Sequence, residues 1–185
     1  MAYQTRQRDP LLDSSMQAAL EKRGREALGI VLILTGIGLI LMLASYNPDD
    51  PSWWAATDAV PQNLLGRFGA SCAALLMLVV GWGSYGLAFG ALIWGVRLAA
   101  HLGGERALSR IIFLPIAVAL AAIYAATHQP PATWDQSYGL GGVFGDTVLG
   151  ALLNVLPFAI GTGLKILAAL SFLTLIALGL FVLGV

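Results

Sequence analysis

Few side chains in this 185-residue chain have the types and spacing that catalysis requires. Ser84, within Gly81-Trp82-Gly83-Ser84-Tyr85-Gly86, has the setting of a nucleophile inside an apolar segment. A serine nucleophile needs a base within hydrogen-bond reach, and both histidines, His101 and His128, are expected at the ends of apolar segments. We therefore expect Ser84 to be a small residue at a helix contact, and the chain not to be an enzyme.

Three aspartates, Asp49, Asp50 and Asp58, could offer oxygen ligands to a hard cation. A calcium site needs more oxygens around a defined loop, and Asp and Pro in this stretch are typical of turns. Gly161-Thr162-Gly163-Leu164-Lys165 lacks the spacing of a nucleotide-binding loop. Cys72 is the single cysteine and excludes an intramolecular disulfide. We expect no metal, nucleotide or other cofactor in this chain.

The composition indicates that a membrane domain positions these residues. The chain is 58% hydrophobic and 11% charged, with a mean hydropathy of +0.80, whereas a soluble domain is about half apolar and about a quarter charged. Basic and acidic side chains cancel, so the net charge suggests neither nucleic acid nor an acidic partner. We predict an all-α polytopic membrane protein with four transmembrane helices and one interfacial or re-entrant helix.

The chain divides into a cytoplasmic N-terminal segment, residues 1–26, and a membrane domain, residues 27–185. Ser14 with Gln17 fits a capping box, which predicts a short polar helix that leads into the membrane. Apolar runs then follow that can cross a bilayer core of about 30 Å, the third run only marginally. The predicted spans are about 27–45, 69–96, 111–127 and 162–185.

The segment 142–158 has two interpretations. Its apolar residues share one helical face, but Asp146, Asn154 and Pro157 make so short a segment a poor transmembrane helix. We favour a non-spanning helix over a fifth span. The candidate residues of this re-entrant segment are Gly141, Gly142, Gly145, Asp146 and Pro157.

The distribution of positive charge predicts the orientation. With four spans, only Arg67 and Lys165 lie on one side of the membrane. The other side carries Arg6, Arg8, Lys22, Arg23, Arg25, Arg97, Arg106 and Arg110. Because cytoplasmic loops are enriched in Lys and Arg, both termini are expected in the cytoplasm. A fifth span would move Lys165 to the positive side, so the charge rule alone slightly favours five spans.

Small residues four apart occur along the second predicted span, at Gly86, Gly90, Ala91 and Gly95. Such residues let helix backbones approach closely. We expect them to pack helices within the chain, and packing between chains is the alternative.

Ser45-Tyr46-Asn47-Pro48-Asp49-Asp50-Pro51-Ser52-Trp53, followed by Asn63-Leu64-Leu65-Gly66-Arg67-Phe68-Gly69-Ala70, resembles the first extracytoplasmic loop of the FtsK/SpoIIIE DNA translocases. The pattern there is approximately S-[YF]-x-P-x-D-P-S-W and then N-x-x-G-x-x-G-A. Gly141-Gly142-Val143-Phe144-Gly145 is similar to the G-G-x-x-G that precedes the last span of that family. The candidate interaction residues of this loop are Tyr46, Pro48, Asp50, Pro51, Ser52, Trp53, Asn63 and Gly66.

The resemblance covers about residues 20–185 and implies the four-span N-terminal domain of an FtsK-type protein of the bacterial inner membrane. It also implies cytoplasmic termini and a segment 142–158 that does not span. In that family the membrane domain localises the protein to the division septum, helps it form a hexamer and contacts other division proteins. DNA and ATP are expected only through a RecA-like motor that this chain lacks.

A subunit of a small membrane transporter or channel is the alternative function. Several spans and a re-entrant helix would fit it. The first three predicted spans, however, contain no Asp, Glu, Lys or Arg in their interiors, and ion transport usually needs such groups. We therefore expect a membrane anchor and scaffold that contacts the lipid bilayer, other copies of itself and other proteins.

Overall fold

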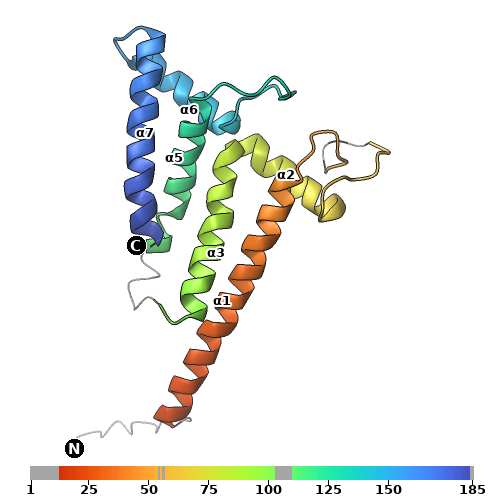
Figure 1. Ribbon diagram of the computed structural model, residues 1–185, viewed down its shortest axis with the longest axis vertical. Helices are drawn as coiled ribbons and strands as arrows, with labels where there is room; N and C mark the ends of the chain where they lie inside the picture. Colours follow the sequence, from red (N-terminus) through yellow and green to blue (C-terminus); the bar gives the residue numbers. More distant parts are fainter. Residues whose placement is uncertain (1–12, 54, 56, 103–109, 184–185) are drawn as a thin grey trace, which may run out of the picture.

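The computed structural model describes residues 13–53, 55, 57–102 and 110–183, and this part of the chain contains helices and no strand (Figure 1). The elements are α1 (Ser14–Ala44), α2 (Gly66–Val80), the 3-10 turn η1 (Gly81–Ser84), α3 (Tyr85–Ala99), α5 (Leu114–Ala126), α6 (Gly142–Val155) and α7 (Ile160–Leu183). The predicted all-α fold class is confirmed. Arg6, Arg8 and Arg106, which enter the predicted charge pattern, lie outside the described residues.

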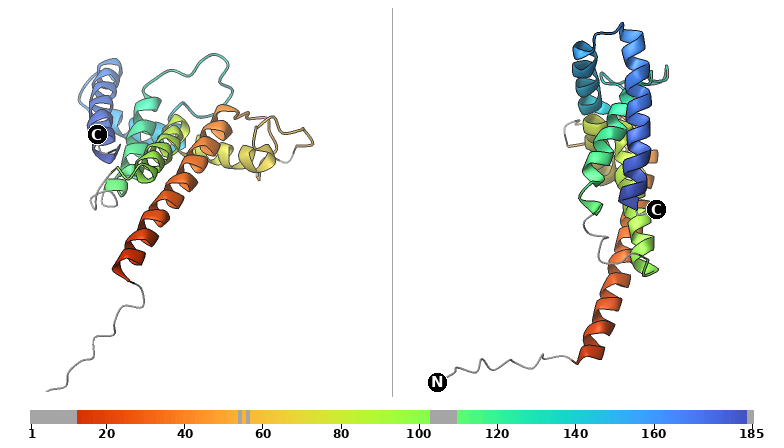
Figure 2. Two further views of the ribbon diagram at one scale, coloured as in Figure 1. Left: turned by 60° about the horizontal axis from the view of Figure 1, so that its bottom comes forward. Right: turned by 90° about the vertical axis from the view of Figure 1, so that its left-hand side faces the viewer.

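Four helices, α1, α3, α5 and α7, stand side by side in that order and alternate in direction (Figure 1 and Figure 2). α1 packs mainly along α3, and α5 contacts both α3 and α7. The helices α2 and α6 contact each other and lie obliquely near the end where α1 ends and α7 begins. Because of the alternation, α1 begins and α7 ends toward the same end of the molecule.

Helix α1 joins the polar N-terminal residues and the first apolar run in a single helix of 31 residues. Its polar part carries two ion pairs at the i,i+3 and i,i+4 spacings that bring side chains together on a helix. These pairs are Arg23–Glu26 at 2.8 Å and Arg25–Glu21 at 2.6 Å. The predicted capping box is wrong, because the helix begins at Ser14 and Asp13 takes the N-cap position.

The predicted second span, 69–96, lies in one apolar stretch that is bent rather than straight. Helix α2 ends at Val80, Gly81 has a φ of 55°, and the chain continues through η1 into α3. A left-handed φ interrupts the helical hydrogen-bond ladder and is adopted readily only by glycine. The stretch Gly66–Ala99, 34 residues long, therefore fits its surroundings by bending near its middle.

Within the described residues, three helical stretches are long and apolar enough to cross a membrane: Ser15–Ala44, Gly66–Ala99 and Ile160–Leu183. Helix α5 is apolar but has 13 residues, which corresponds to about 20 Å and is less than the bilayer core of about 30 Å. Pro115 lies in its first turn, where the missing N–H costs no helical hydrogen bond.

Large apolar side chains cover the outside of the helices. In the most apolar window of α7, 11% of the residues are buried, and Leu34, Phe89 and Leu173 are more than half exposed. The buried core is small and includes Met42 and Met77, where α1 meets α2. Such a surface is stable when lipid rather than water surrounds it.

Candidate functional site

The carboxylate of Asp50 closes the loop between α1 and α2. Asp50 is 4% exposed, and its oxygens accept hydrogen bonds from the backbone N–H of Gln62 at 2.8 Å and of Asn63 at 2.9 Å. A carboxylate that is removed from water needs such donors. Asp50 therefore ties the two ends of the loop together. No group of three or more His, Cys, Asp or Glu side chains in the described part of the chain is placed to hold a metal ion.

Asn63 fastens this loop to the end of α1. Its Nδ2 donates to the backbone oxygens of Met42 at 2.8 Å and Ser45 at 3.3 Å. Its Oδ1 accepts a hydrogen bond from the N–H of Leu65 at 3.1 Å. The last carbonyls of a helix have no partner within the helix, so the Asn63 amide supplies donors that α1 lacks and joins them to the start of α2.

Ser45 and Gly66 complete the connection. The Oγ of Ser45 donates to the backbone oxygen of Leu41 at 2.6 Å and accepts from the N–H of Leu64 at 3.0 Å. Gly66 has a φ of 64°, a conformation that glycine adopts without steric cost. We call Ser45, Asp50 and Asn63 the polar clamp.

The remaining predicted loop residues differ in burial. Pro51 is fully buried, Ser52 is half-buried and Pro48 is exposed. The hydroxyl of Tyr46 lies 3.4 Å from that of Tyr138. Burial raises the pKa of Tyr46 above its ordinary value, and the hydrogen bond with Tyr138 adds a smaller rise in the same direction. The Tyr46 side chain is therefore neutral.

Two exposed aromatic side chains meet at the surface, one from the loop and one from the start of α2. Trp53 is 66% exposed, and its ring meets that of Phe68 edge-on, with centroids 6.4 Å apart. Phe68 is 67% exposed, and Val60 and Leu64 are more exposed still. We call Trp53 and Phe68 the apolar patch. The sequence motif indicates Trp53, but not Phe68, which is one apolar residue at the start of a long apolar run.

The predicted small residues of α3 face two different neighbours. Gly95 faces α1, where an added Cβ would lie 2.7 Å from the backbone nitrogen of Ile33. Gly90 and Gly86 face α5, where added Cβ atoms would lie 2.9 Å and 3.3 Å from its side chains. Ala91 is half-buried. These glycines thus bring α3 close to helices of the same chain.

Three glycines at the start of α6 allow its backbone to contact the bend at Gly81 and the backbone of α5. Gly142 has a φ of 66°, and an added Cβ would lie 2.6 Å from the backbone nitrogen of Gly81. Added Cβ atoms on Gly141 and Gly145 would collide with the backbone oxygen of Ala122 in α5. We call Gly81, Gly141, Gly142 and Gly145 the glycine crossing, because backbone meets backbone there.

Gly141 and Pro157 mark the two ends of α6. Gly141 takes the N-cap position. Asp146 does not cap the helix, and its carboxylate accepts a hydrogen bond from the N–H of Gly139 at 2.5 Å. The helix ends at Val155, and Leu156 is extended with a ψ of 133°. A residue that precedes proline is pushed out of the helical region, which explains why α6 stops before Pro157.

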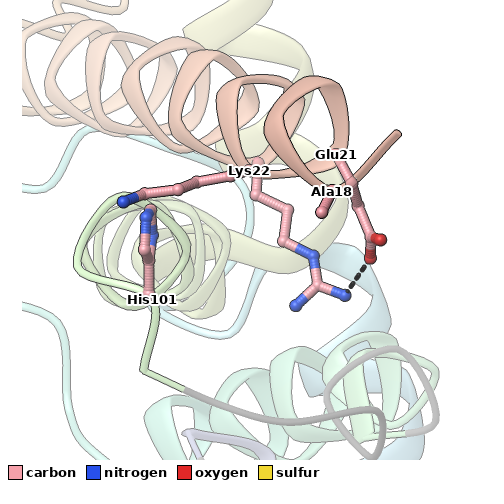
Figure 3. A pocket seen from close by; sticks show the side chains of 5 residues that line it. Ala18, Glu21, Lys22 and His101 are labelled. Carbon is pink, nitrogen blue, oxygen red and sulfur yellow. Dashed lines mark hydrogen bonds and ion pairs between the residues drawn. The ribbon is translucent and has the colours of Figure 1, made fainter. Parts of the chain in front are cut away.

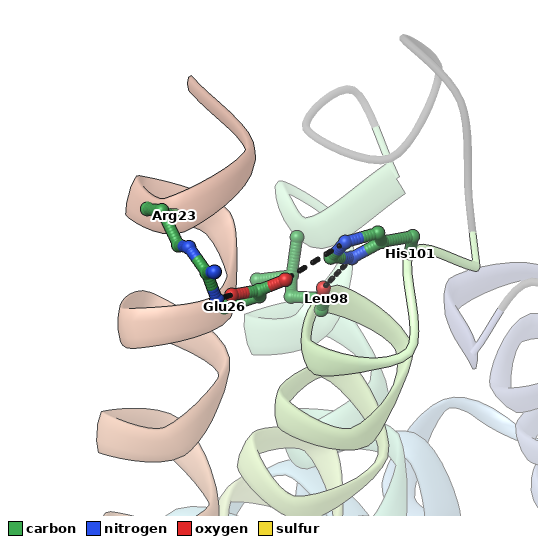
Figure 4. Close-up of polar contacts among 4 residues, drawn as sticks. All are labelled: Arg23, Glu26, Leu98 and His101. Atoms are coloured by element: carbon green, nitrogen blue, oxygen red, sulfur yellow. Dashed lines mark hydrogen bonds and ion pairs between the residues drawn. The ribbon is translucent and has the colours of Figure 1, made fainter. Parts of the chain in front are cut away.

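Ser84 is fully buried, and its Oγ donates to the backbone oxygen of Gly81 at 2.6 Å. His101 lies two residues beyond the end of α3, and its Nε2 lies 3.1 Å from a carboxylate oxygen of Glu26 on α1 (Figure 4). His128 follows α5 and contacts the backbone of that helix. The geometry therefore gives Ser84 a structural hydrogen bond within η1, and it pairs the histidines with other groups.

The family model that describes the 4TM region of DNA translocase FtsK/SpoIIIE matches residues 21–184. The chain belongs to this family. The resemblance seen in the loop is confirmed, and so is the prediction of a polytopic membrane protein. The 4TM description of FtsK/SpoIIIE agrees with the four alternating helices α1, α3, α5 and α7.

Relatives of this chain carry the name DNA translocase FtsK. The protein of Azospirillum brasilense is 33% identical over 152 residues, which cover 81% of this chain and 24% of the relative. The protein of Caulobacter vibrioides is 36% identical over 152 residues, which cover 78% of this chain and 18% of the relative. The chain thus spans about a quarter or less of these FtsK proteins. No solved structure matches it.

Proposed function

We propose that this chain is the membrane anchor and assembly domain of an FtsK-type DNA translocase, and that it places the translocase at the division septum of a bacterial cell. The observation that carries the proposal is the match of residues 21–184 to the 4TM region of FtsK/SpoIIIE. The polar clamp supports it, because it gives fixed geometry to the loop whose sequence resembles the family. DNA and ATP would be handled by a motor outside this chain.

The proposed orientation has both ends of the domain in the cytoplasm. The alternation of α1, α3, α5 and α7 supports it, since α1 begins and α7 ends toward the same end of the molecule. Described cations at that end are Lys22, Arg23, Arg25, Arg97 and Arg110. Arg67 and Lys165 lie toward the opposite end, which agrees with the enrichment of cytoplasmic loops in positive charge.

A reporter that is active on only one side of the membrane, fused after Val185, tests this orientation. We expect cytoplasmic activity, because four crossings return the chain to its starting side. A second fusion within the loop, at exposed Asp58, is expected to report the opposite side. Extracytoplasmic activity of the C-terminal fusion would contradict both the orientation and the attachment of a cytoplasmic motor.

The apolar patch is proposed to dock other division proteins on the extracytoplasmic side. Large exposed apolar groups on a rigid support are typical of interaction sites. We expect the double variant Trp53→Ala/Phe68→Ala to insert normally but to lose septal fluorescence when fused to a fluorescent protein. Asp58→Ala, in the same loop, is the matched control and should remain septal. Normal septal recruitment of the double variant would remove the patch from the proposal.

Self-association, as a hexamer, is proposed to use the groove between α2 and α6. This groove has a volume of about 400 Å³ and is lined by Leu78, Val79, Val143, Phe144, Thr147 and Val148. In a Cys72→Ser background, Phe144→Cys offers one thiol per protomer and should give disulfide-linked dimers under oxidation. Leu173→Cys, on the exposed side of α7, is the control and should give little crosslinking. Equal crosslinking at both positions would contradict the groove as the interface.

A further inference from the structure

The N-terminal part of α1 projects beyond the end of α3. An added Cβ on Gly29 would lie 2.5 Å from the backbone nitrogen of Ala99, the last residue of α3. Residues of α1 that precede Gly29 therefore extend past α3 (Figure 1). Most of these residues are exposed, so α3 does not cover the side of α1 that faces it in this part.

At His101, the chain turns after the end of α3 toward this uncovered part of α1. Its φ is 57°, which is uncommon for a residue other than glycine. The N–H of His101 donates to the backbone oxygen of Leu98 at 3.2 Å, and the N–H of Leu102 donates to that of Arg97 at 2.7 Å. This is the Schellman arrangement that ends many helices. The turn brings the imidazole to α1, where it contacts Glu26 (Figure 4).

A pocket of about 270 Å³ lies between the overhanging part of α1 and the end of α3 (Figure 3). Its lining residues are Ala18, Glu21, Lys22, Arg25 and His101. Arg25 pairs with Glu21 at 2.6 Å, and Glu26 is engaged by Arg23 and His101. Lys22 has no ion-pair partner among the described residues. The pocket therefore has an excess of positive charge and free donors, which favours an anion.

The position of the pocket relative to the bilayer indicates where that anion comes from. Ala27 begins the charge-free stretch that continues through Ser45. At about 1.5 Å per residue, Lys22 lies about 8 Å outside this stretch and Arg25 about 3 Å outside it. The polar layer of a bilayer extends about 5–8 Å beyond each side of its hydrocarbon core. Both cations thus lie at the level of phospholipid headgroups.

We propose that this pocket is a binding site for the phosphate of an anionic phospholipid in the leaflet next to the start of α1. Basic pockets between helices on the cytoplasmic side of membrane proteins bind such headgroups. The pocket is smaller than the roughly 300–1,000 Å³ of sites for small soluble ligands, so a headgroup whose chains stay in the bilayer fits better than a nucleotide. This site is independent of septal targeting and of the division proteins.

Native mass spectrometry of the purified protein in neutral detergent, with phosphatidylglycerol or phosphatidylcholine added, tests this site. Removing a cation that contacts the headgroup should weaken binding by about fivefold, so Lys22→Gln/Arg25→Gln should bind phosphatidylglycerol about 25-fold more weakly. Lys22→Arg should retain binding. Arg23→Gln is the matched control, because Arg23 lies on the same helix outside the pocket lining, and should change binding by about twofold or less.

Three results would overturn the proposal. Equal losses in Arg23→Gln and the double variant would mean diffuse attraction rather than a site. Equal retention of phosphatidylcholine and phosphatidylglycerol would show that the negative charge of the headgroup does not determine binding. Displacement of the lipid by inorganic phosphate at the same concentration would identify a soluble anion as the ligand.

Discussion

The polar clamp and the glycine crossing hold two parts of one membrane domain by opposite means. In the clamp, the buried side chains of Asp50 and Asn63 form hydrogen bonds with backbone groups at the end of α1 and just before α2. In the crossing, side chains are absent and the backbones of α5, α6 and η1 meet directly. Removing atoms should therefore break the clamp, and adding atoms should break the crossing.

The difference follows from where unsatisfied backbone groups occur. At the end of α1 the last carbonyls lack helical partners and need donors from elsewhere. Within α5 and α6 most backbone groups are already paired in the helices, so the contact gains from close approach alone. Side-chain hydrogen bonds thus hold the loop, whereas close packing at glycines holds the helix crossing.

The largest effect is expected when a side chain is added to the crossing. Gly142→Ala places a Cβ 2.6 Å from the nitrogen of Gly81 at a φ of 66°. Overpacking costs about 1–3 kcal/mol and a left-handed alanine about 1–2 kcal/mol, so we expect a loss of about 3–4 kcal/mol in the free energy of unfolding. Denaturant unfolding in detergent micelles measures it.

Gly150→Ala is the control for this prediction. Gly150 lies in α6, and an added Cβ meets nothing within 4 Å. Alanine is favoured over glycine inside a helix by about 0.5–1 kcal/mol, so this variant should be slightly more stable than the parent protein. Similar behaviour of both variants would show that the crossing is not held by close backbone contact.

The next effect comes from removing atoms from the clamp. Asn63→Ala leaves the backbone oxygens of Met42 and Ser45 without the amide donor, and a buried polar group without a partner costs about 1–3 kcal/mol. We expect a loss of about 2 kcal/mol in the same unfolding assay. Gln62→Ala is the control, because Asp50 uses only the backbone N–H of Gln62. If Asn63→Ala lowers the free energy of unfolding no more than Gln62→Ala does, the Asn63 amide does not hold the loop to α1.

A smaller, pH-dependent effect is expected at Tyr46, which lies beside the clamp. Its pKa is raised in the folded protein, so the unfolded chain ionises first, near pH 10. Stability is therefore unaffected below about pH 10 and falls as the pH rises above it. Tyr46→Phe should remove this alkaline loss at a cost of about 0.5 kcal/mol at neutral pH.

Unfolding measured between about pH 8 and pH 11 tests the Tyr46 prediction. Tyr138→Phe removes the hydrogen-bond partner but leaves Tyr46 itself able to ionise. It should therefore keep the alkaline loss that Tyr46→Phe removes. An identical alkaline loss in the Tyr46→Phe variant would assign the effect to other groups.

Much of the fold could be predicted from the sequence, because apolar runs and charged ends report directly on helices in a bilayer. The break at Gly81 could not be predicted. A bent and a straight helix need the same apolar stretch, and the φ of Gly81 is set by its contact with Gly142, far along the chain. The predicted polar helix before the first span is present as the first part of α1, and ion pairs at helical spacing support it.

For the candidate site, the loop motif identifies Asp50 and Asn63 but gives no sign of what they do. Their role depends on the end of α1, which only the fold brings to them. The loop motif does not include Tyr138, which comes from a distant loop and meets Tyr46 only in the folded protein. The motif also joins residues with opposite roles, since Pro51 is buried and Trp53 is exposed.

A stability effect as small as that of Tyr46→Phe is expected for Trp53, within the same loop as the clamp. Its ring is 66% exposed and touches Phe68 edge-on, a contact worth about 0.5–1.5 kcal/mol beyond burial, and less where water reaches it. Trp53→Ala should therefore lower the free energy of unfolding by about 0.5 kcal/mol. Pro51→Ala, two residues away and fully buried, should cost about 1–2 kcal/mol. If Trp53→Ala proves the more damaging of the two, the ring belongs to the support of the loop, and loss of septal localisation in its variants would report unfolding rather than docking.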